Sequence, residues 1–447
     1  MSTVMDRIGD KISFRPVSCS LEDVIRIAPA LRMLLRKNKA SITVFKTNNL
    51  VSRYIEDRRE FFSIFSPVKS NQILNKILIP AYIVKYKDID EQYRVIKEEL
   101  RKQANVNIVA IQGTGVFTWG ETKASADKRM AFFLDLVKIK NYSSLNNKVN
   151  LIEINNCLSQ SYGRVVTAPP EGEKGLSEKI AIVTGAARGF GKGIAESLAE
   201  EGANVILADL NADMAGKNAL SLNEKYGKGK FLALKTDVTD EDYVKNMIWE
   251  TVAEYGGIDI FISNAGVLKA GGLESMDLES FELSTKVNYT AFFLCTKYAS
   301  ELMKIQFRFS KDYFSDIIQI NSKSGLEGSK KNFTYAGSKF GGIGLVQSFA
   351  LELIEYNIKV NAVCPGNFFE GPLWSDPEKG LFTQYLKSKK VPSARTIEDV
   401  RRFYESKVPM KRGCQIDDIA KAIFYIIDQK YETGQAIPVT GGQIMLR

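Results

Sequence analysis

A glycine-rich turn between an apolar run and a helical stretch constrains the fold of this chain most. Residues 179–183 (KIAIV) form an apolar run of strand length, and the turn TGAARGFG at 184–191 leads into a helix expected over 192–201. Such a turn lets backbone N–H groups and a helix N-terminus approach a pyrophosphate without side-chain obstruction. A glycine cluster alone is often only a turn, but this strand–turn–helix context predicts dinucleotide binding.

A carboxylate at the end of the next predicted strand indicates which dinucleotide is bound. The strand expected over 204–208 ends in Asp209, eighteen residues after Gly191. Its carboxylate can accept hydrogen bonds from the adenosine ribose hydroxyls and would repel a 2′-phosphate, which favours NAD over NADP. Arg188 in the turn is a weaker signal in the opposite direction, because a guanidinium can pair with that phosphate.

A tyrosine and a lysine on one helix face supply the candidate chemistry. An apolar strand is expected over 316–320, and Tyr335 and Lys339 follow, four residues apart on a helix. A phenol titrates near pH ~10, and a nearby ammonium favours the phenolate. Tyr335 could then take a proton from an alcohol. Taken alone, such a pair is more often a solvated lysine beside a half-buried tyrosine.

The surrounding pattern resembles the short-chain dehydrogenase/reductase family. Ser322 lies at a strand end, thirteen positions before Tyr335, as the catalytic serine does in that family. The resemblance runs through residues 175–447. Its other landmarks are Asp237-Val238 after a strand at 231–235, Asn264-Ala265-Gly266 after a strand at 258–263, Asn288 in the following helix, Pro365-Gly366 after a strand at 358–363, and a seventh strand at 434–439.

The resemblance implies a role for each matching residue. Tyr335 is the base, Lys339 lowers the pKa of Tyr335 and bonds the nicotinamide ribose, Ser322 donates to the substrate oxygen, and Asn288 orders a relay water. No metal is implied. The cofactor, NAD, is expected against Thr184, Gly185, Arg188, Gly189, Phe190, Gly191, Asp209, Asp237, Val238, Asn264, Ala265, Gly266, Tyr335, Lys339, Pro365 and Gly366.

Five more particular strings resemble the family members that act on sorbitol 6-phosphate: IIQINSKSG at 317–325, GSKKN at 328–332, KFGGIGL at 339–345, KVPMKRGC at 407–414 and ETGQAIPVTGGQIM at 432–445. They imply interconversion of D-sorbitol 6-phosphate and D-fructose 6-phosphate with NAD. The phosphorylated polyol is expected near Lys323, Lys330, Asn332 and Asn367, with Arg395, Arg401 or Arg402 as other candidates for the anion.

Three other functions stay open. Another NAD-dependent polyol or sugar-phosphate dehydrogenase differs only in loop residues at 367–402. A non-catalytic NAD-binding regulatory or scaffold protein would not need Ser322, Tyr335 and Lys339. A bifunctional aldolase is disfavoured because the chain has no histidine.

The first part of the chain is predicted to form a smaller α/β domain. Helices are expected over 21–37 (with Pro29 as a kink or break), 48–64, 91–103 and 124–138, and extended segments over 41–46, 73–86 and 106–111. Residues 107–138 and the string RIAPALR at 26–32 are similar to the aldolase-like domain of bifunctional rhamnulose-phosphate aldolase/dehydrogenase proteins. The predicted organisation is an aldolase-like domain at 1–160, a linker at 161–174 and a Rossmann-type doubly wound parallel sheet at 175–447.

The absence of histidine also excludes several enzyme classes. The 447 residues can make no Ser-His-Asp triad, no HExxH zinc site and no histidine-rich metal site. Five scattered cysteines indicate reduced thiols. The net charge of +9 is spread without a basic block, which predicts no nucleic acid, and no apolar run is long enough for a membrane span. Charges in residues 1–10 indicate a cytoplasmic protein. The family resemblance implies a homotetramer.

Overall fold

The computed structural model describes residues 14–17, 19–36, 40–68, 77–145, 151–162, 174–269, 271–378, 380–387 and 389–445. The chain divides into two compact units, which are described separately. Unit 1 comprises Met1–Glu178, Trp249–Gly257 and Arg308–Ser310, and unit 2 comprises Lys179–Ile248, Ile258–Phe307 and Lys311–Arg447. Residues 163–173 of the predicted linker lie outside the described part of the chain.

Unit 2 is built on a seven-stranded parallel sheet in the order β11-β10-β9-β8-β5-β6-β7. The order reverses direction beside β5, as in a doubly wound Rossmann-type sheet, so the predicted fold class is confirmed. The strands are β5 (Ile180–Thr184), β6 (Asn204–Asp209), β7 (Phe231–Lys235), β8 (Ile260–Ser263), β9 (Ser315–Ile320), β10 (Ile358–Pro365) and β11 (Ala436–Val439).

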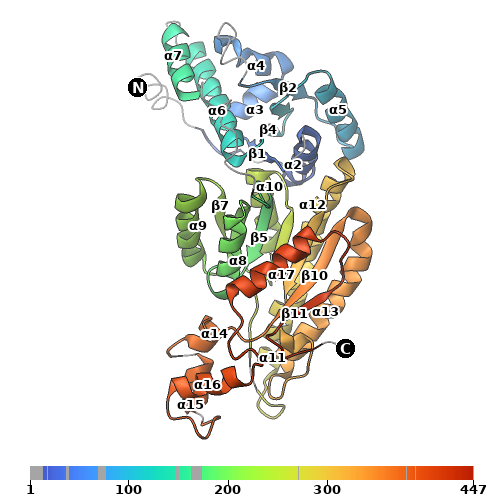
Figure 1. The fold of residues 1–447 in the computed structure, drawn as a ribbon. Coiled ribbons are helices and arrows are strands. Elements are labelled where there is room, and N and C mark those ends of the chain that lie inside the picture. The colour runs from blue at the N-terminus through green and yellow to red at the C-terminus, as the bar shows by residue number, and fades with distance from the viewer. Residues whose placement is uncertain are drawn as a thin grey trace. The chain divides into compact units, whose positions relative to one another are not determined.

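Helices cover both faces of this sheet, which explains why its central strands are continuous apolar runs. On the face that Figure 1 shows in front of the strands, helix α8 contacts both α9 and α17. The helices that belong wholly or mainly to unit 2 are α8 (Gly189–Glu200), α9 (Ala212–Tyr226), α10 (Glu241–Tyr255), α11 (Leu278–Thr285), η3 (Lys286–Thr290), α12 (Ala291–Phe309), η4 (Lys323–Gly325), α13 (Phe333–Leu353), η5 (Ile354–Tyr356), α14 (Pro372–Ser375), α15 (Leu381–Lys387), α16 (Ile397–Ser406) and α17 (Ile416–Asp428).

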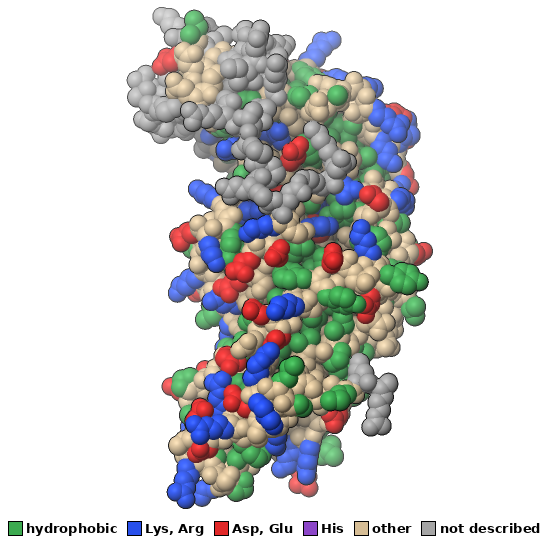
Figure 2. Space-filling view, viewed as in Figure 1, with side chains coloured by type: hydrophobic (Ala, Val, Ile, Leu, Met, Phe, Trp, Pro, Cys, Tyr) green, Lys and Arg blue, Asp and Glu red, His purple; other side chains and the backbone are tan. Residues whose placement is uncertain are grey.

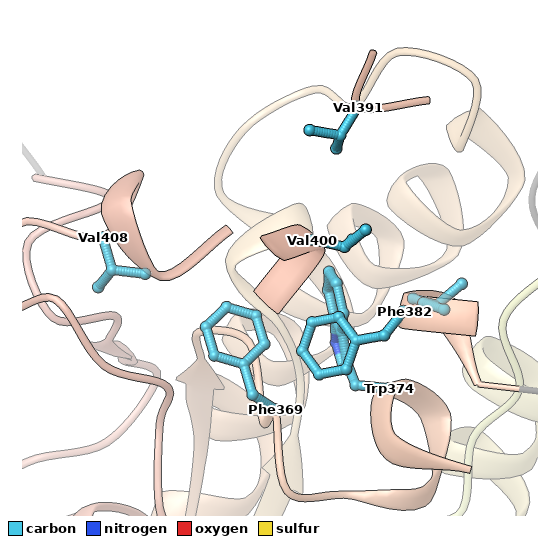
Figure 3. Close-up of a cluster of buried hydrophobic side chains, with 7 residues drawn as sticks. Phe369, Trp374, Phe382, Val391, Val400 and Val408 are labelled. Carbon is cyan, nitrogen blue, oxygen red and sulfur yellow. The ribbon is translucent and has the colours of Figure 1, made fainter. Parts of the chain in front are cut away.

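Helices α14, α15 and α16 form a separate small layer, which we call the helical lobe (residues 369–408; Figure 1). The lobe has its own apolar core, in which Phe369, Trp374 and Phe382 contact one another through their rings (Figure 3). Val400 on α16 is fully buried in the same cluster. The lobe is therefore held together by its own packing.

Unit 1 contains a four-stranded mixed sheet in the order β1-β4-β3-β2. Strand β4 is antiparallel to β1 and β3, whereas β2 and β3 are parallel. The elements are α2 (Leu21–Leu35), β1 (Ile42–Lys46), α3 (Asn49–Ile55), α4 (Arg58–Ser63), η1 (Ser66–Val68), β2 (Pro80–Ile83), α5 (Ile89–Arg101), β3 (Ile108–Ile111), β4 (Gly115–Gly120), α6 (Lys123–Leu145) and α7 (Leu151–Tyr162).

Unit 1 differs from the predictions in its helix and strand bounds. The single helix expected over 48–64 is two helices, because Asp57 adopts an extended conformation and caps α4 by accepting from the backbone of Arg59 and Glu60. Helix α2 continues through Pro29, so of the predicted kink or break the break is absent. Strand β4 was not predicted; it follows the turn at Gly113, whose φ of 64° is in the left-handed region that favours glycine. Of the apolar segment expected over 73–86, only Pro80–Ile83 is a strand, and 73–76 lie outside the described residues.

The surface of the visible face carries both signs of charge, with Lys and Arg interspersed among Asp and Glu (Figure 2). None of the described helices has the length and apolar character that crossing a membrane requires.

A buried ion pair joins the starts of two neighbouring strands of unit 2. Lys359 on β10 lies opposite Asp316 on β9, with Nζ 3.0 Å from Oδ1, and the two side chains are 0% and 5% exposed. Lys359 also donates to the carbonyl of Gln429 at 2.6 Å and to that of Ile426, so it ties the end of α17 to the sheet. Burial raises the pKa of Asp316 to about 6.

We expect Asp316→Ala to lower the free energy of unfolding by about 3–5 kcal/mol, because it leaves the Lys359 ammonium buried without its carboxylate. Chemical denaturation of the full chain measures this loss. The exposed Asp428 at the end of α17 provides the control, and its replacement by Ala should change stability by less than about 0.5 kcal/mol. A loss at Asp316 no larger than that of the control would contradict the role given to the pair.

Candidate functional site

A cleft of about 1060 Å³ lies at the carboxyl ends of the strands of unit 2. This is the edge at which open parallel α/β sheets bind ligands, next to the point where the strand order reverses. The cleft collects most of the residues singled out from the sequence: Gly185, Arg188, Gly189, Phe190, Asp209, Asp237, Val238, Asn264, Ala265, Gly266, Ser322, Lys323, Lys330, Asn332, Tyr335, Lys339, Pro365, Gly366 and Asn367. Thr184, Gly191 and Asn288 are not part of its lining. Each instead supports residues that line the cleft, as described below.

The glycine-rich turn brings a helix start to the cleft. Gly185 and Gly189 have φ values of 67° and 62°, which favour glycine. Helix α8 begins at Gly189, three residues earlier than Lys192, where it was predicted. Arg188 is its N-cap and makes no side-chain capping bond. The first N–H groups of α8 are thus available to an anion in the cleft.

The position of Gly191 admits no side chain. A Cβ there would lie 2.1 Å from the carbonyl oxygen of Gly185 and 2.5 Å from Nδ2 of Asn264. Asn264 uses the same Nδ2 to donate to the carbonyls of Thr184 (2.9 Å) and Gly185 (3.2 Å). Thr184 Oγ1 in turn accepts from the backbone N–H groups of Asn264 (3.0 Å) and Ala265 (3.1 Å). These bonds fix the glycine-rich turn against the end of β8.

Two carboxylates follow the next strands. Asp209 accepts from the backbone of Ala187 at 2.9 Å and of Asn211 at 2.8 Å, one with each oxygen. Asp237 accepts from the backbone and hydroxyl of Thr239 at 2.9 and 2.7 Å. Each carboxylate oxygen has two lone pairs, so Asp209 can hold the turn and still accept from a ligand hydroxyl.

Ser322, Tyr335 and Lys339 meet at the centre of the cleft. Ser322 caps η4 by accepting from Ser324 N at 3.1 Å, and it also hydrogen-bonds Tyr335. Lys339 is buried, donates to the carbonyl of Ile320 at 3.0 Å, and lies with Nζ 5.6 Å from the centroid of the Tyr335 ring. The predicted lysine–tyrosine proximity is therefore present.

The pKa of Tyr335 differs from the expectation. It is raised, chiefly by burial, while the hydrogen bond with Ser322 lowers it. Desolvation of the phenolate is therefore the larger effect on the pKa of Tyr335, and the lowering of that pKa by Lys339 stays a prediction. Burial also lowers the pKa of Lys339, to about 8. Both groups titrate in an environment that disfavours charge.

Asn288 lies in a π-helical turn, η3, between α11 and α12. π-helical turns occur frequently at functional sites. Its side chain accepts from Val267 N and donates to Val267 O, both at 2.9 Å, and donates to Ser338 Oγ at 3.2 Å. The side chain therefore positions the segment after β8 against α13, and the ordering of a relay water stays a prediction.

The candidate substrate residues divide into two groups. Lys323, Lys330, Asn332 and Asn367 line the cleft. Arg395, Arg401 and Arg402 are not part of the lining; Arg401 pairs with Glu370 at 2.7 Å and Glu405 at 2.8 Å, and Arg402 with Glu398 at 3.4 Å.

Sequence reasoning missed the wall that the helical lobe adds to the cleft. Trp374, Tyr385, Lys390, Tyr404 and Lys407 all line it. It also missed Phe368, whose ring stacks on Phe190 at 4.4 Å between centroids. The string KVPMKRGC, which begins at Lys407, was the one sequence signal that could have pointed to this wall.

Comparison with known proteins agrees with this geometry. Residues 179–374 match the short chain dehydrogenase family. The chain is 36% identical over 272 residues to sorbitol-6-phosphate 2-dehydrogenase of Escherichia coli K12, an alignment that covers 60% of this chain and 99% of that protein. The chain belongs to the short-chain dehydrogenase family. It is accordingly an oxidoreductase of that family.

Solved structures of family members share the fold of unit 2. A crystal structure of sorbitol-6-phosphate 2-dehydrogenase from Erwinia amylovora is 39% identical, with a TM-score of 0.55, and covers 60% of this chain and 100% of its own. A 3-ketoacyl-(acyl-carrier-protein) reductase from Brucella melitensis, complexed with NADH, is 25% identical with a TM-score of 0.50, over 60% and 98%.

One relative resembles more of this chain. An uncharacterised oxidoreductase of Bacillus subtilis is 29% identical over 344 residues, which is 75% of this chain and 48% of that protein. Since residues 175–447 make up less than 75% of the chain, the likeness reaches into the residues before 175.

Proposed function

We propose that this family member interconverts D-sorbitol 6-phosphate and D-fructose 6-phosphate with NAD. The observation that carries the proposal is the 36% identity to a sorbitol-6-phosphate 2-dehydrogenase over 99% of that protein's length. The grouping of Ser322, Tyr335 and Lys339 in one cleft supports it, since this is the chemistry an alcohol oxidation needs.

The cleft fits a dinucleotide at its glycine-rich end. Gly185 and Gly189 line this end without side chains, and the start of α8, which has no side-chain cap, presents N–H groups to a pyrophosphate. Asp209 would accept from the adenosine ribose hydroxyls, which supports NAD over NADP. When bound, the nicotinamide ring supplies the acceptor for a hydride.

At the other end, the protein residues handle the proton and the substrate oxygen. Tyr335 takes the proton of the C2 hydroxyl as C2 becomes a carbonyl, and Ser322 donates to the same oxygen. Lys339, charged below about pH 8, favours the phenolate of Tyr335 through its ammonium.

The alternatives differ in what the cleft must hold. Another polyol or sugar-phosphate dehydrogenase would use the same three residues with a different lobe wall. A regulatory NAD-binding protein would not need a half-buried tyrosine hydrogen-bonded to Ser322. An aldolase activity of the residues before 175 is not proposed, because the chain has no histidine to hold its metal.

The homotetramer also stays a prediction, with support from exposed apolar side chains on three neighbouring helices of unit 2. These are Leu278 and Phe281 on α11, Phe293 on α12, and Phe340 and Leu351 on α13. Burying them in a homo-oligomer would remove apolar surface from water.

Mixing the full chain with NAD and sorbitol 6-phosphate should form NADH. Its formation is measured by absorbance at about 340 nm, where reduced nicotinamide absorbs. Unphosphorylated sorbitol in parallel should be oxidised about tenfold to a hundredfold less efficiently in kcat/KM, because it lacks the dianion. Equal kcat/KM values for the two polyols would contradict the proposal that the substrate is phosphorylated. Absence of NADH with every polyol phosphate tried would overturn the function.

Tyr335→Phe should remove nearly all turnover and leave NADH binding intact, because the base is lost while the glycine-rich turn is formed elsewhere. Steady-state kinetics measure the first effect and fluorescence titration with NADH the second. Tyr431→Phe, which alters a tyrosine that is 99% exposed, should behave as wild type. If Tyr335→Phe keeps more than about a few percent of the wild-type kcat, Tyr335 is not the base.

NAD should be preferred over NADP by about tenfold or more in kcat/KM, a difference of ~1.4 kcal/mol. Asp209→Asn should lower the ratio of kcat/KM for NAD to kcat/KM for NADP, because it removes the charge that repels the 2′-phosphate. The Asn side chain keeps an oxygen that can accept from a backbone N–H of the turn. Asp213→Asn on the exposed side of α9 is the matched control and should leave the ratio unchanged. Equal use of both cofactors by the wild type would mean that Arg188 outweighs Asp209.

A further inference from the structure

The lobe wall of the cleft carries cations held against aromatic rings. The rings of Tyr385 and Tyr404 stack with their centroids 5.3 Å apart. Lys390 Nζ lies 3.8 Å from the centroid of Tyr385, and Lys407 Nζ lies 5.4 Å from that of Tyr404. Contact with a ring face holds an ammonium in place without neutralising its charge. The wall thus offers positive charge to the cleft.

Lys407 is the better anchored of these two cations. It ends α16, and its backbone N–H donates to the last turn of that helix. The next residue, Val408, is buried in the lobe core. Two residues further on, the N–H of Met410 donates to the carbonyl of Gly441 at 3.2 Å. The backbone of Lys407 is therefore fixed both to the lobe and to the segment after β11.

Lys323 faces the same cleft from the catalytic side. Lys323 is the first residue of η4, directly after Ser322, and its side chain is half-buried. Burial lowers its pKa, the Glu327 carboxylate raises it, and the positive charge of Lys407 lowers it again. The two lysines therefore repel each other across the cleft.

Within the described part of the chain neither lysine has a carboxylate at ion-pair distance, and the Glu327 carboxylate acts on Lys323 only through its charge. Some other lysines of unit 2 are paired, such as Lys297 with Glu241 at 3.4 Å. Two unpaired ammonium groups that repel each other gain most from an anion placed between them, and a phosphate dianion gives both of them charge-assisted hydrogen bonds.

We propose that Lys407 of the helical lobe and Lys323 of the catalytic core hold the substrate's phosphate group between them. The proposal rests on the function proposed above and deepens it, because it assigns Lys407 as a specificity-determining residue. It also sets the orientation of the substrate, with the phosphate toward the lobe and C2 toward Tyr335.

A purely structural role for Lys407 is the alternative that the test must separate. A lysine at the end of α16 interacts favourably with the helix C-terminus, and its Nζ is 4.2 Å from the centroid of Phe403. If the role is structural, Lys407→Ala should lower the midpoint of thermal unfolding. It should then affect the binding of phosphorylated and unphosphorylated ligands equally.

The test is calorimetric titration of the full chain, with NAD present, with fructose 6-phosphate and in parallel with fructose. Lys407→Ala and Lys323→Ala should each weaken fructose 6-phosphate binding by about tenfold or more, and leave NAD affinity and the midpoint of thermal unfolding unchanged. Lys407→Arg should retain binding. Lys387→Ala is the control, because Lys387 is an exposed lysine of the same lobe outside the cleft lining.

The outcomes separate this proposal from the function on which it rests. Wild-type binding of fructose 6-phosphate that Lys407→Ala leaves unchanged, or that Lys387→Ala weakens equally, overturns the role of Lys407 and leaves the proposed reaction standing. Binding that depends on Lys407, without turnover of sorbitol 6-phosphate, supports the phosphate site and overturns the reaction. No binding of fructose 6-phosphate by the wild type overturns both.

Discussion

The contact between the glycine-rich turn and the end of β8 is the constraint on which unit 2 depends. Gly191 of α8 packs against the Gly185 carbonyl and the Asn264 amide so closely that a methyl group has no room. The same amide closes hydrogen bonds to the end of β5. The two central strands and the first helix are thus locked together at the point where the strand order reverses. The rest of the cleft is built outward from this junction.

Burial is the second organising effect, and it acts on the chemistry. Tyr335 and Lys339 both lie where a charge is poorly solvated, so burial raises the pKa of one and lowers the pKa of the other. The shifts move the two values apart, because the pKa of Lys339 falls from 10.5 to about 8 while that of Tyr335 rises from 10.0. A phenol that keeps its proton is suited to donate that proton to a carbonyl oxygen, which is the proton transfer that ketone reduction requires.

The sequence was most informative where function and packing use the same residues. The parallel strands were visible as apolar runs, and most of the cleft residues at their ends followed from the resemblance to the short-chain dehydrogenase family. The lobe wall was not visible, because Tyr385, Tyr404 and Lys407 meet only after three short helices pack together. The raised pKa of Tyr335 was missed for a related reason, since burial is a property of the folded chain. In unit 1, Asp57 ended a helix whose apolar periodicity continued across it.

The separate core of the helical lobe has an evolutionary consequence. Because Phe369, Trp374 and Phe382 pack mainly among themselves, residues that face the cleft from the lobe can be exchanged without disturbing the sheet or the tyrosine–lysine pair. Ligand choice and hydride chemistry are then encoded in two packing units that tolerate mutation independently. A chain organised in this way can acquire a new substrate by rebuilding a small hydrophobic cluster, while its reaction is inherited unchanged.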